Sequence, residues 1–481
     1  MNEITMGLDV KSDRPLYEQI YQFIKEEIKS GRLAFGERLP STRKLAEHLQ
    51  VSRSTVDMAY EQLLSEGYIE SVPCRGYFIS ELDGIYHLVP KNHAKKQKEP
   101  LPEKCYAYDF SPNGVDLGSF PYNAWRKLSK NILMDDKKEL FMLGAPAGEA
   151  ILQETIADYL HQARGVACRP EQVIIGAGTD YLLMLLCSVW GGRRKIAMEN
   201  PTYKRAYRVL KTLNNEMYSV SLDKNGMRME ELEKSGADVA YVMPSHQYPL
   251  GTVMPMKRRM KLLGWAGEKP GRYIIEDDYD SEFRYKGKPI PCLQGFDRKG
   301  CVIYLGTFSK SIAPAIRVSY MVLPDSLMEA YKSRGSVFAS TVSRVDQMIV
   351  AGFLREGYYE RHLNKMRALY RGRHDALLEG LKEIPGITVH GENAGVHLLV
   401  TFENGMTEAE VIARAGKEGI RVYGLSGYYT ENTQETQKAT VILGYANLEE
   451  SEIRRAVSDL KKAWTVRNVS MKKAGEDNGD H

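Results

Sequence analysis

Two apolar stretches that each end in polar residues limit the fold of this chain more than any other feature. The first runs from Tyr273 to Tyr279 (YIIEDDY) and ends in carboxylates and a tyrosine. The second runs from Tyr304 to Arg317 (YLGTFSKSIAPAIR) and places Lys310 in a polar turn after its apolar residues. Short apolar runs bounded by turn residues are typical of buried strands in a parallel sheet. The pattern therefore predicts an α/β fold with reactive side chains at the strand ends.

These side chains match what pyridoxal phosphate requires of a protein. A lysine forms the Schiff base, a carboxylate keeps the pyridine nitrogen protonated, and a hydroxyl and a guanidinium bind the phenolate oxygen and the phosphate. A single lysine after a strand is usually a solvated turn residue, but the combination of all four groups is much rarer. The sequence therefore predicts a pyridoxal phosphate site.

Composition sets the broad class. At 481 residues the chain is too long for one hydrophobic core, so two or three domains are expected. Its net charge of +4 is small for this length and says little about partners. The six cysteines show no CxxC pair and no His–Cys spacing, which indicates a reducing compartment and neither a disulfide framework nor a metal site. The start of the chain does not resemble a signal peptide, and no apolar run is long enough for a membrane span, so we expect a cytoplasmic protein.

The first eighty residues predict a small helical domain followed by a hairpin. Apolar spacing predicts a helix over Pro15–Ser30, a second helix capped by Ser41, and a third that begins at Ser52 and ends at Gly67. Tyr68–Ile79 then has the pattern of two short strands around a turn. Three helices followed by a hairpin form a winged helix-turn-helix, whose second motif helix enters the major groove of DNA.

Polar side chains occupy the positions that face DNA in such a domain. They are Arg53, Ser54 and Thr55 at the start of the third helix, Arg43 and Lys44 at the start of the second, and Arg75 at the hairpin tip. The alternative is a helical domain with ordinary surface arginines. Charge does not decide between them, because residues 1–80 hold 10 Lys+Arg against 12 Asp+Glu. The order of the elements carries the prediction.

The same region resembles the GntR family of bacterial transcription regulators. The resemblance rests on Leu39–Ala46 (LPSTRKLA), Val51–Val56 (VSRSTV) and Glu66–Tyr68 (EGY), within residues 14–79. It implies that the DNA-contacting residues are Arg43, Arg53, Ser54, Thr55 and Arg75. Asp57 departs from relatives that carry a basic residue there, and an acid cannot approach a phosphate.

The chain divides into four parts. Residues 1–80 are expected to form the DNA-binding domain, and residues 81–107, rich in lysine and proline, a semi-rigid linker. A basic linker of this kind could also contact DNA phosphates. Residues 108–466 are expected to form the large domain, and the polar residues 467–481 a disordered tail.

In the large domain, helical patterns alternate with short apolar runs, which predicts a mainly parallel sheet. The expected strands are 173–175, 195–198, 239–243, 273–275, 302–305 and 318–323. The turn Gly176–Thr179 opens a helix and can present backbone amides to a phosphate. A long amphipathic helix is expected from Asp346 past Leu369, in a smaller C-terminal subdomain.

Residues 108–466 resemble the fold type I aminotransferases. By this resemblance Lys310 is the Schiff-base lysine, Asp277 the pyridinium partner and Tyr279 the partner of the phenolate oxygen. The phosphate cup would be Gly178, Thr179, Thr307 and Arg317, and the aromatic ring stacked on the cofactor would be Tyr203. The loop Ser245–Gly251 (SHQYPLG) lacks the asparagine that aminotransferases place beside the phenolate oxygen, so His246 or Gln247 is expected to replace it.

A GntR-type domain joined to an aminotransferase-like domain resembles the MocR/GabR subfamily. The resemblance implies a pyridoxal-phosphate-dependent transcription regulator that binds double-stranded promoter DNA as a head-to-tail homodimer. It implies control of amine, amino-acid or vitamin B6 genes through a small-molecule effector, either an amine, an amino acid or pyridoxal phosphate itself.

The effector and the enzymatic status stay open at this stage. Arg205 is the candidate effector residue for a carboxylate, although it could also bind the partner's phosphate site or be a surface arginine. Gly427 stands where GABA-responsive members carry a carboxylate-binding arginine, which argues against that effector. The two alternatives are a working aminotransferase with an added DNA-binding domain, and a large domain that serves only for dimerisation.

Overall fold

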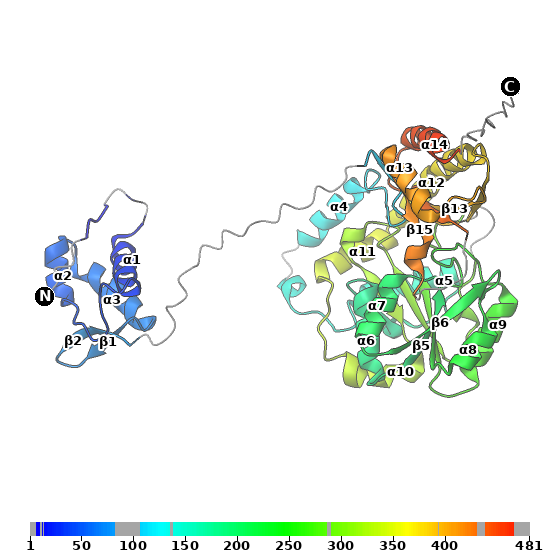
Figure 1. Ribbon diagram of the computed structural model, residues 1–481. Helices are drawn as coiled ribbons and strands as arrows, with labels where there is room; N and C mark the ends of the chain where they lie inside the picture. Colours follow the sequence, from blue (N-terminus) through cyan, green and yellow to red (C-terminus); the bar gives the residue numbers. More distant parts are fainter. Residues whose placement is uncertain are drawn as a thin grey trace, which may run out of the picture. The chain divides into compact units, whose positions relative to one another are not determined.

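The computed structural model contains two compact units, residues Met1–Lys104 and Cys105–His481, and each is described by itself (Figure 1). The described residues are 6–9, 12, 14–81, 106–134, 138–285, 290–392, 394–430 and 438–465. Nearly all of the expected linker and the whole of the expected tail lie outside these residues.

The N-terminal unit is a winged helix-turn-helix, as predicted. Its elements are α1 (Leu16–Lys29), α2 (Thr42–Leu49), α3 (Arg53–Ser65), β1 (Ile69–Val72) and β2 (Gly76–Ile79). Ile20, Ile24 and Ile28 form the buried stripe of α1, because residues four apart lie on one helix face.

Two serines fix where the motif helices begin. The Ser41 hydroxyl accepts a hydrogen bond from the amide of Lys44 at 3.3 Å, and the Ser52 hydroxyl accepts one from the amide of Thr55 at 3.2 Å. Such caps satisfy amides that have no partner within the helix. Both caps confirm the prediction from sequence.

The C-terminal unit is built on a mainly parallel sheet with the strand order β4-β11-β10-β9-β8-β5-β6-β7 among the described residues. The strands are β4 (Val173–Gly176), β5 (Lys195–Asn200), β6 (Glu216–Asp223), β7 (Gly226–Met227), β8 (Val239–Val242), β9 (Tyr273–Asp278), β10 (Val302–Thr307) and β11 (Ser319–Val322). The expected strands are all present. β11 is antiparallel to both neighbours.

β6 and β7 were not predicted from the sequence. β6 (EMYSVSLD) alternates polar and apolar residues and is mostly half-buried, because only β7 lies beyond it in the sheet. It therefore lacks the continuous apolar run that marks the central strands.

Helices cover both faces of this sheet (Figure 1). Ile196 and Met198 of β5 pack in the same core as α6 (Thr179–Trp190), α7 (Lys204–Thr212) and α10 (Asp325–Ala330). Ala197, between them, packs with α8 (Met229–Ser235) and α9 (Met256–Gly267). This alternation follows from the period of two in a strand, and a sheet covered on both faces explains the apolar runs.

The C-terminal subdomain contains a smaller sheet and long helices. Its elements are β12 (Ile387–His390), β13 (His397–Phe402), β15 (Tyr423–Gly424), β16 (Thr440–Gly444), α12 (Tyr358–Lys382), α13 (Glu408–Lys417) and α14 (Glu450–Trp464). The prediction of one continuous helix from Asp346 was wrong. α11 (Arg344–Arg355) ends before Gly357, whose left-handed φ of 70° breaks the helix while the apolar pattern continues into α12. Within the described part of the chain, no helix has both the length and the apolar character needed to cross a membrane.

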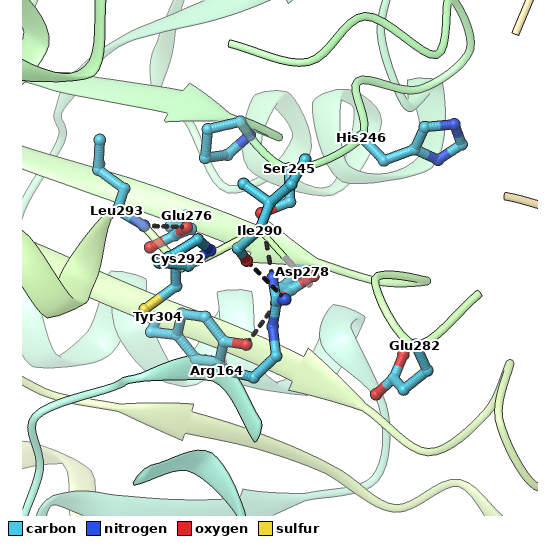
Figure 2. Close-up of polar contacts among 12 residues, drawn as sticks. Arg164, Ser245, His246, Glu276, Asp278, Glu282, Ile290, Cys292, Leu293 and Tyr304 are labelled. Atoms are coloured by element: carbon cyan, nitrogen blue, oxygen red, sulfur yellow. Dashed lines mark hydrogen bonds and ion pairs between the residues drawn. The ribbon is translucent and has the colours of Figure 1, made fainter. Parts of the chain in front are cut away.

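A buried ion pair joins separate parts of the large domain (Figure 2). Arg164, the last residue of α5 (Ala150–Arg164), lies 2.7 Å from the carboxylate of Asp278 at the end of β9. Its guanidinium also donates to the hydroxyl of Ser245 at 3.0 Å and to the carbonyl of Ile290 at 2.8 Å. The hydroxyl of Tyr304 on β10 donates to the same carboxylate at 2.5 Å.

We expect Arg164→Met to lower the free energy of unfolding of the large domain by about 3–5 kcal/mol, because it leaves Asp278 buried without its partner. The matched control is Arg169→Met, whose ion pair with Asp325 is solvent-exposed and should contribute less than about 1 kcal/mol. Urea denaturation followed by circular dichroism measures both. Equal effects of the two variants would contradict the role given to Arg164.

Candidate functional site

A cavity lies at the carboxyl ends of β9 and β10 in the large sheet. Predicted site residues that line it are Gly178, Thr179, Tyr203, Arg205, Asp277, Tyr279, Thr307, Lys310 and Arg317. Further lining residues, which were not predicted from the sequence, are Asn113, Asp180, Met243, Tyr248 and Ser309. Residues up to 204 positions apart in the chain therefore meet in one site.

Parallel strand pairing explains why these residues meet. Leu305 of β10 lies opposite Asp277 of β9, so the carboxyl ends of the two strands coincide. Asp277 thus lies near Thr307, which ends β10, and near the turn that carries Lys310. A cavity at the carboxyl ends of parallel strands is the common location of ligand sites in open α/β sheets.

Lys310 is a buried lysine with an unusual proton affinity. Burial lowers its pKa from 10.5 to about 8, and the negative charge of Asp280 opposes this shift. Its ammonium nitrogen donates a hydrogen bond to the carbonyl of Pro112 at 3.1 Å. A lysine with a lowered pKa is partly neutral near pH 7 and can react with a carbonyl group.

Asp277 is a buried carboxylate on the same cavity. Burial raises its pKa to about 7, and a hydrogen bond donated by the hydroxyl of Tyr241 acts in the opposite direction. No lysine or arginine forms an ion pair with Asp277 among the described residues. A cationic ring nitrogen placed against this carboxylate would favour its charged form.

The other end of the cavity can hold an anion. α6 begins at Thr179, so the first amides of the helix point into the cavity region. Gly178 has a left-handed φ of 95°, and a Cβ at this position would overlap the guanidinium of Arg317. Arg317 donates to the carbonyl of Ala177 at 2.9 Å, and the Thr307 hydroxyl accepts a hydrogen bond from the amide of Ser309 at 3.1 Å.

An acid lies inside this anion cup. The carboxylate of Asp180, in the first turn of α6, pairs with Arg205 and lies 3.8 Å from Arg317. It therefore holds both guanidinium groups of the cavity. The position of Asp180 directly after Gly178 and Thr179 could have identified it from the sequence.

The expectation that His246 or Gln247 replaces the missing asparagine is corrected by the structure. Neither residue lines the cavity, whereas Tyr248 does. His246 is buried against Asp280, and Gln247 donates to the carbonyl of Pro201 at 2.9 Å. The signal that could have identified Tyr248 is its place directly before Pro249, since the aminotransferase loop has an asparagine before a proline.

The predicted DNA-facing residues lie on the surface of the N-terminal unit. Arg43, Lys44, Arg53, Ser54 and Arg75 are exposed, and Thr55 is half-buried. The Arg53 guanidinium lies 3.5 Å from the carboxylate of Asp57 one turn later, an exposed pair that costs little to separate. Arg75 lies over the ring of Phe78 at 5.6 Å, which holds it at the hairpin.

Both units match known protein families. Residues 16–79 match the model for bacterial regulatory proteins of the gntR family, and residues 109–460 match the model for class I and II aminotransferases. The large domain is similar to a multiple substrate aminotransferase from Thermococcus profundus, with 28% identity, a TM-score of 0.66, and coverage of 75% of this chain and 92% of that chain.

Relatives match over nearly the full length. The HTH-type transcriptional regulator YhdI of Bacillus subtilis is 41% identical, covering 96% of this chain and 98% of its own. The probable rhizopine catabolism regulatory protein MocR of Rhizobium meliloti is 32% identical, covering 95% of each chain.

Fold, cavity and relatives together define a helix-turn-helix protein fused to an aminotransferase-type domain, the kind of domain that uses pyridoxal phosphate in its family. The chain belongs to the GntR family of transcription regulators, in the MocR-like group that carries this second domain.

The lowered pKa of Lys310 gives a pH-dependent prediction. In cofactor-free protein, we expect reductive methylation of Lys310 to rise with pH and to reach half its maximal rate near pH 8, because the neutral amine is the reactive form. Mass spectrometry of the peptide that contains Lys310 measures this rate. Urea-denatured protein is the control, and its midpoint should move up toward 10.5. A midpoint near 10.5 in the folded protein would contradict the burial argument.

Proposed function

We propose that this protein is a pyridoxal-phosphate-dependent transcription regulator. Residues 1–80 would bind promoter DNA, and residues 108–466 would bind the cofactor, sense an effector and form a homodimer. The single observation that carries the proposal is the cavity in which a buried lysine of lowered pKa lies with Asp277 and a cup for an anion. The same chain also contains a winged helix-turn-helix.

Each cavity residue has a role that suits its chemistry. Bound pyridoxal phosphate supplies an aldehyde that reacts reversibly with primary amines. Lys310 would hold the aldehyde carbon, Asp277 would bind the protonated ring nitrogen, and Tyr279 would bind the phenolate oxygen. Gly178, Thr179, Thr307 and Arg317 would bind the phosphate. Tyr203 would cover one face of the ring, and Tyr248 would stand where aminotransferases have asparagine.

The effector would be a primary amine, an amino acid or the cofactor itself. Arg205 lines the cavity and its side chain is 61% exposed, so it can reach a carboxylate that enters from solvent. Gly427 offers no second cation, which favours an effector with one carboxylate or none. Asp180 would have to release Arg205 before a carboxylate binds there.

The large domain would associate as a head-to-tail homodimer. Phe141, Leu143 and Val337 expose 78%, 90% and 73% of their surface. Large apolar side chains exposed to this extent suggest an interface with another copy of the chain. Occupancy of the cavity would shift the balance between dimer states that present the DNA-binding domains differently.

The first test is fluorescence anisotropy with the protein's own upstream DNA against a scrambled duplex, at fixed salt, with and without pyridoxal phosphate and candidate amines. Selective binding that responds to cofactor or amine supports the proposal. Unchanged DNA affinity together with unchanged small-angle scattering would contradict it.

Removal of one arginine from the DNA-binding surface should weaken DNA binding more than removal of one arginine from the large domain. We expect Arg53→Ala to weaken selective binding by about 1–3 kcal/mol, because it removes a side chain at the start of the helix that enters the major groove. The control is Arg193→Ala, an exposed arginine of the large domain that removes the same charge. Equal losses from both variants would indicate a non-specific charge effect.

Covalent attachment of the cofactor can be tested directly. After incubation with pyridoxal phosphate and reduction with borohydride, the peptide that contains Lys310 should carry the added mass of the cofactor. We expect Lys310→Ala to show no such addition, because no other lysine is among the described residues that line the cavity. A modified lysine elsewhere in the variant and in the wild type would refute the assignment of Lys310.

One observation favours a second function, a working aminotransferase with an added DNA-binding domain. Lys310, Asp277 and Tyr279 all line the same cavity, so the groups that such a reaction needs are present. Turnover of an amino donor and a 2-oxoacid by the purified protein, without selective DNA binding, would support it.

A further inference from the structure

Asp180 is a negatively charged residue in a part of the cavity that suits negatively charged ligands. It lies in the first turn of α6 and lines the cavity together with Arg205 and Arg317. Its carboxylate pairs with Arg205 of α7 and lies 3.8 Å from the Nη2 atom of Arg317. Within the part of the chain that the structure describes, Arg205 has no other ion-pair partner. A carboxylate therefore already lies beside both guanidinium groups of the cavity.

Arg317 does not need this carboxylate to stay in place. Its Nη2 atom donates a hydrogen bond to the carbonyl of Ala177 at 2.9 Å, and its backbone has a left-handed φ of 54°. A non-glycine residue is uncommon in that region and keeps it only where the surrounding structure fixes the backbone. Gly178 leaves the space for the guanidinium, because a Cβ there would overlap it. The turn before α6 thus holds Arg317 independently of Asp180.

The three charged side chains can separate at little cost. The side chains of Asp180, Arg317 and Arg205 are 23%, 46% and 61% exposed. Ion pairs that water reaches contribute little to stability, because solvent screens them and because long side chains lose freedom when they pair. A phosphate group that enters the cavity can therefore replace the carboxylate at Arg317.

The count of charges indicates what this exchange does to affinity. The two guanidinium groups supply two positive charges, and Asp180 offsets one of them. A phosphate ester carries about two negative charges near pH 7, so these side chains do not fully neutralise it. A site that must first lose an internal competitor binds its ligand with an affinity lowered by the fraction of time in which the site is free.

We propose that Asp180 is a specificity-determining residue, which competes with the phosphate group of the ligand for Arg317 and Arg205 and so makes the binding of pyridoxal phosphate weak and reversible. The inference rests on the proposed function and deepens it. A site that binds its ligand far below the prevailing concentration stays full and reports nothing. With Asp180 present, occupancy of the cavity would follow the concentration of free cofactor, as a sensor requires.

The test compares the affinities of full-length protein for pyridoxal phosphate and for pyridoxal, which lacks the phosphate. Both are measured by the absorbance of the bound ligand. Asp180→Asn removes the charge and keeps the size of the side chain. We expect its Kd for pyridoxal phosphate to fall by about 10 to 100 times, because one competitor and one charge repulsion are lost. Its Kd for pyridoxal should stay nearly unchanged.

The sign of the change separates competition from support. An acid in the first turn of a helix also stabilises that helix through the helix dipole, and Asp180 could hold the guanidinium groups ready for phosphate. Either role predicts weaker binding by Asp180→Asn, the opposite of the expected result. The matched control is Asp325→Asn, which removes a first-turn acid of α10 that pairs with the exposed Arg169 and does not line the cavity. It should change neither Kd.

Inorganic phosphate gives a second measurement that does not depend on Lys310. It should raise the melting temperature of cofactor-free Asp180→Asn more than that of the wild type, because a ligand stabilises the folded state in proportion to its affinity. Asp180→Ser is a second neutral variant and should act in the same direction.

Each outcome decides the proposal. Unchanged or weaker binding of pyridoxal phosphate by Asp180→Asn would overturn it, and so would an equal gain for pyridoxal, because the effect would then not act at the phosphate. If both neutral variants lose the fold, Asp180 serves only the start of α6 and the proposal is wrong. Failure of the wild type and of Asp180→Asn alike to bind pyridoxal phosphate would instead reject the proposed function.

Discussion

The ion pair between Arg164 and Asp278 is the interaction on which the cavity depends. A buried ion pair stabilises a structure only when its remaining donors and acceptors are satisfied, and here Ser245, Ile290 and Tyr304 satisfy them (Figure 2). Asp278 stands between two cavity residues, and Ser245 precedes the loop that carries Tyr248. The pair therefore fixes the backbone of both cavity walls at the place where β9 ends.

Successive residues at the acidic end of β9 lie in two different environments. Asp277 and Tyr279 line the cavity, while Glu276 and Asp278 each have a dedicated partner away from it. Burial raises the pKa of Glu276 to about 7. The hydrogen bonds that its carboxylate accepts from the backbone amides of residues 293 and 294, at 2.7 and 2.8 Å, oppose this shift. The period of two in a strand thus separates carboxylates that hold the fold from the carboxylate left for a ligand.

Features with a local sequence pattern were predictable, and features that depend on contacts between distant segments were not. The caps Ser41 and Ser52 and the end of β9 were predictable, because turn residues and apolar runs report directly on them. His246 was given a place in the cavity because the loop Ser245–Gly251 resembles the aminotransferase loop that carries an asparagine beside the phenolate oxygen. Its partner Asp280 lies 34 positions away, and nothing local shows that this acid would hold the ring behind the wall.

Hydrogen bonds also link residues at the cavity to a loop of the C-terminal subdomain. The carbonyl of Tyr428 accepts a hydrogen bond from the amide of Thr202 at 3.2 Å, and the hydroxyls of Tyr248 and Tyr428 lie 3.2 Å apart. The amide of Thr430 donates to the side chain of Asn200 at 3.0 Å. Since Tyr248 lines the cavity, a ligand that moves its ring would alter a contact that the subdomain loop also uses. A small set of shared hydrogen bonds of this kind suits a two-state response, because a modest difference in ligand affinity between the states is enough to shift their populations.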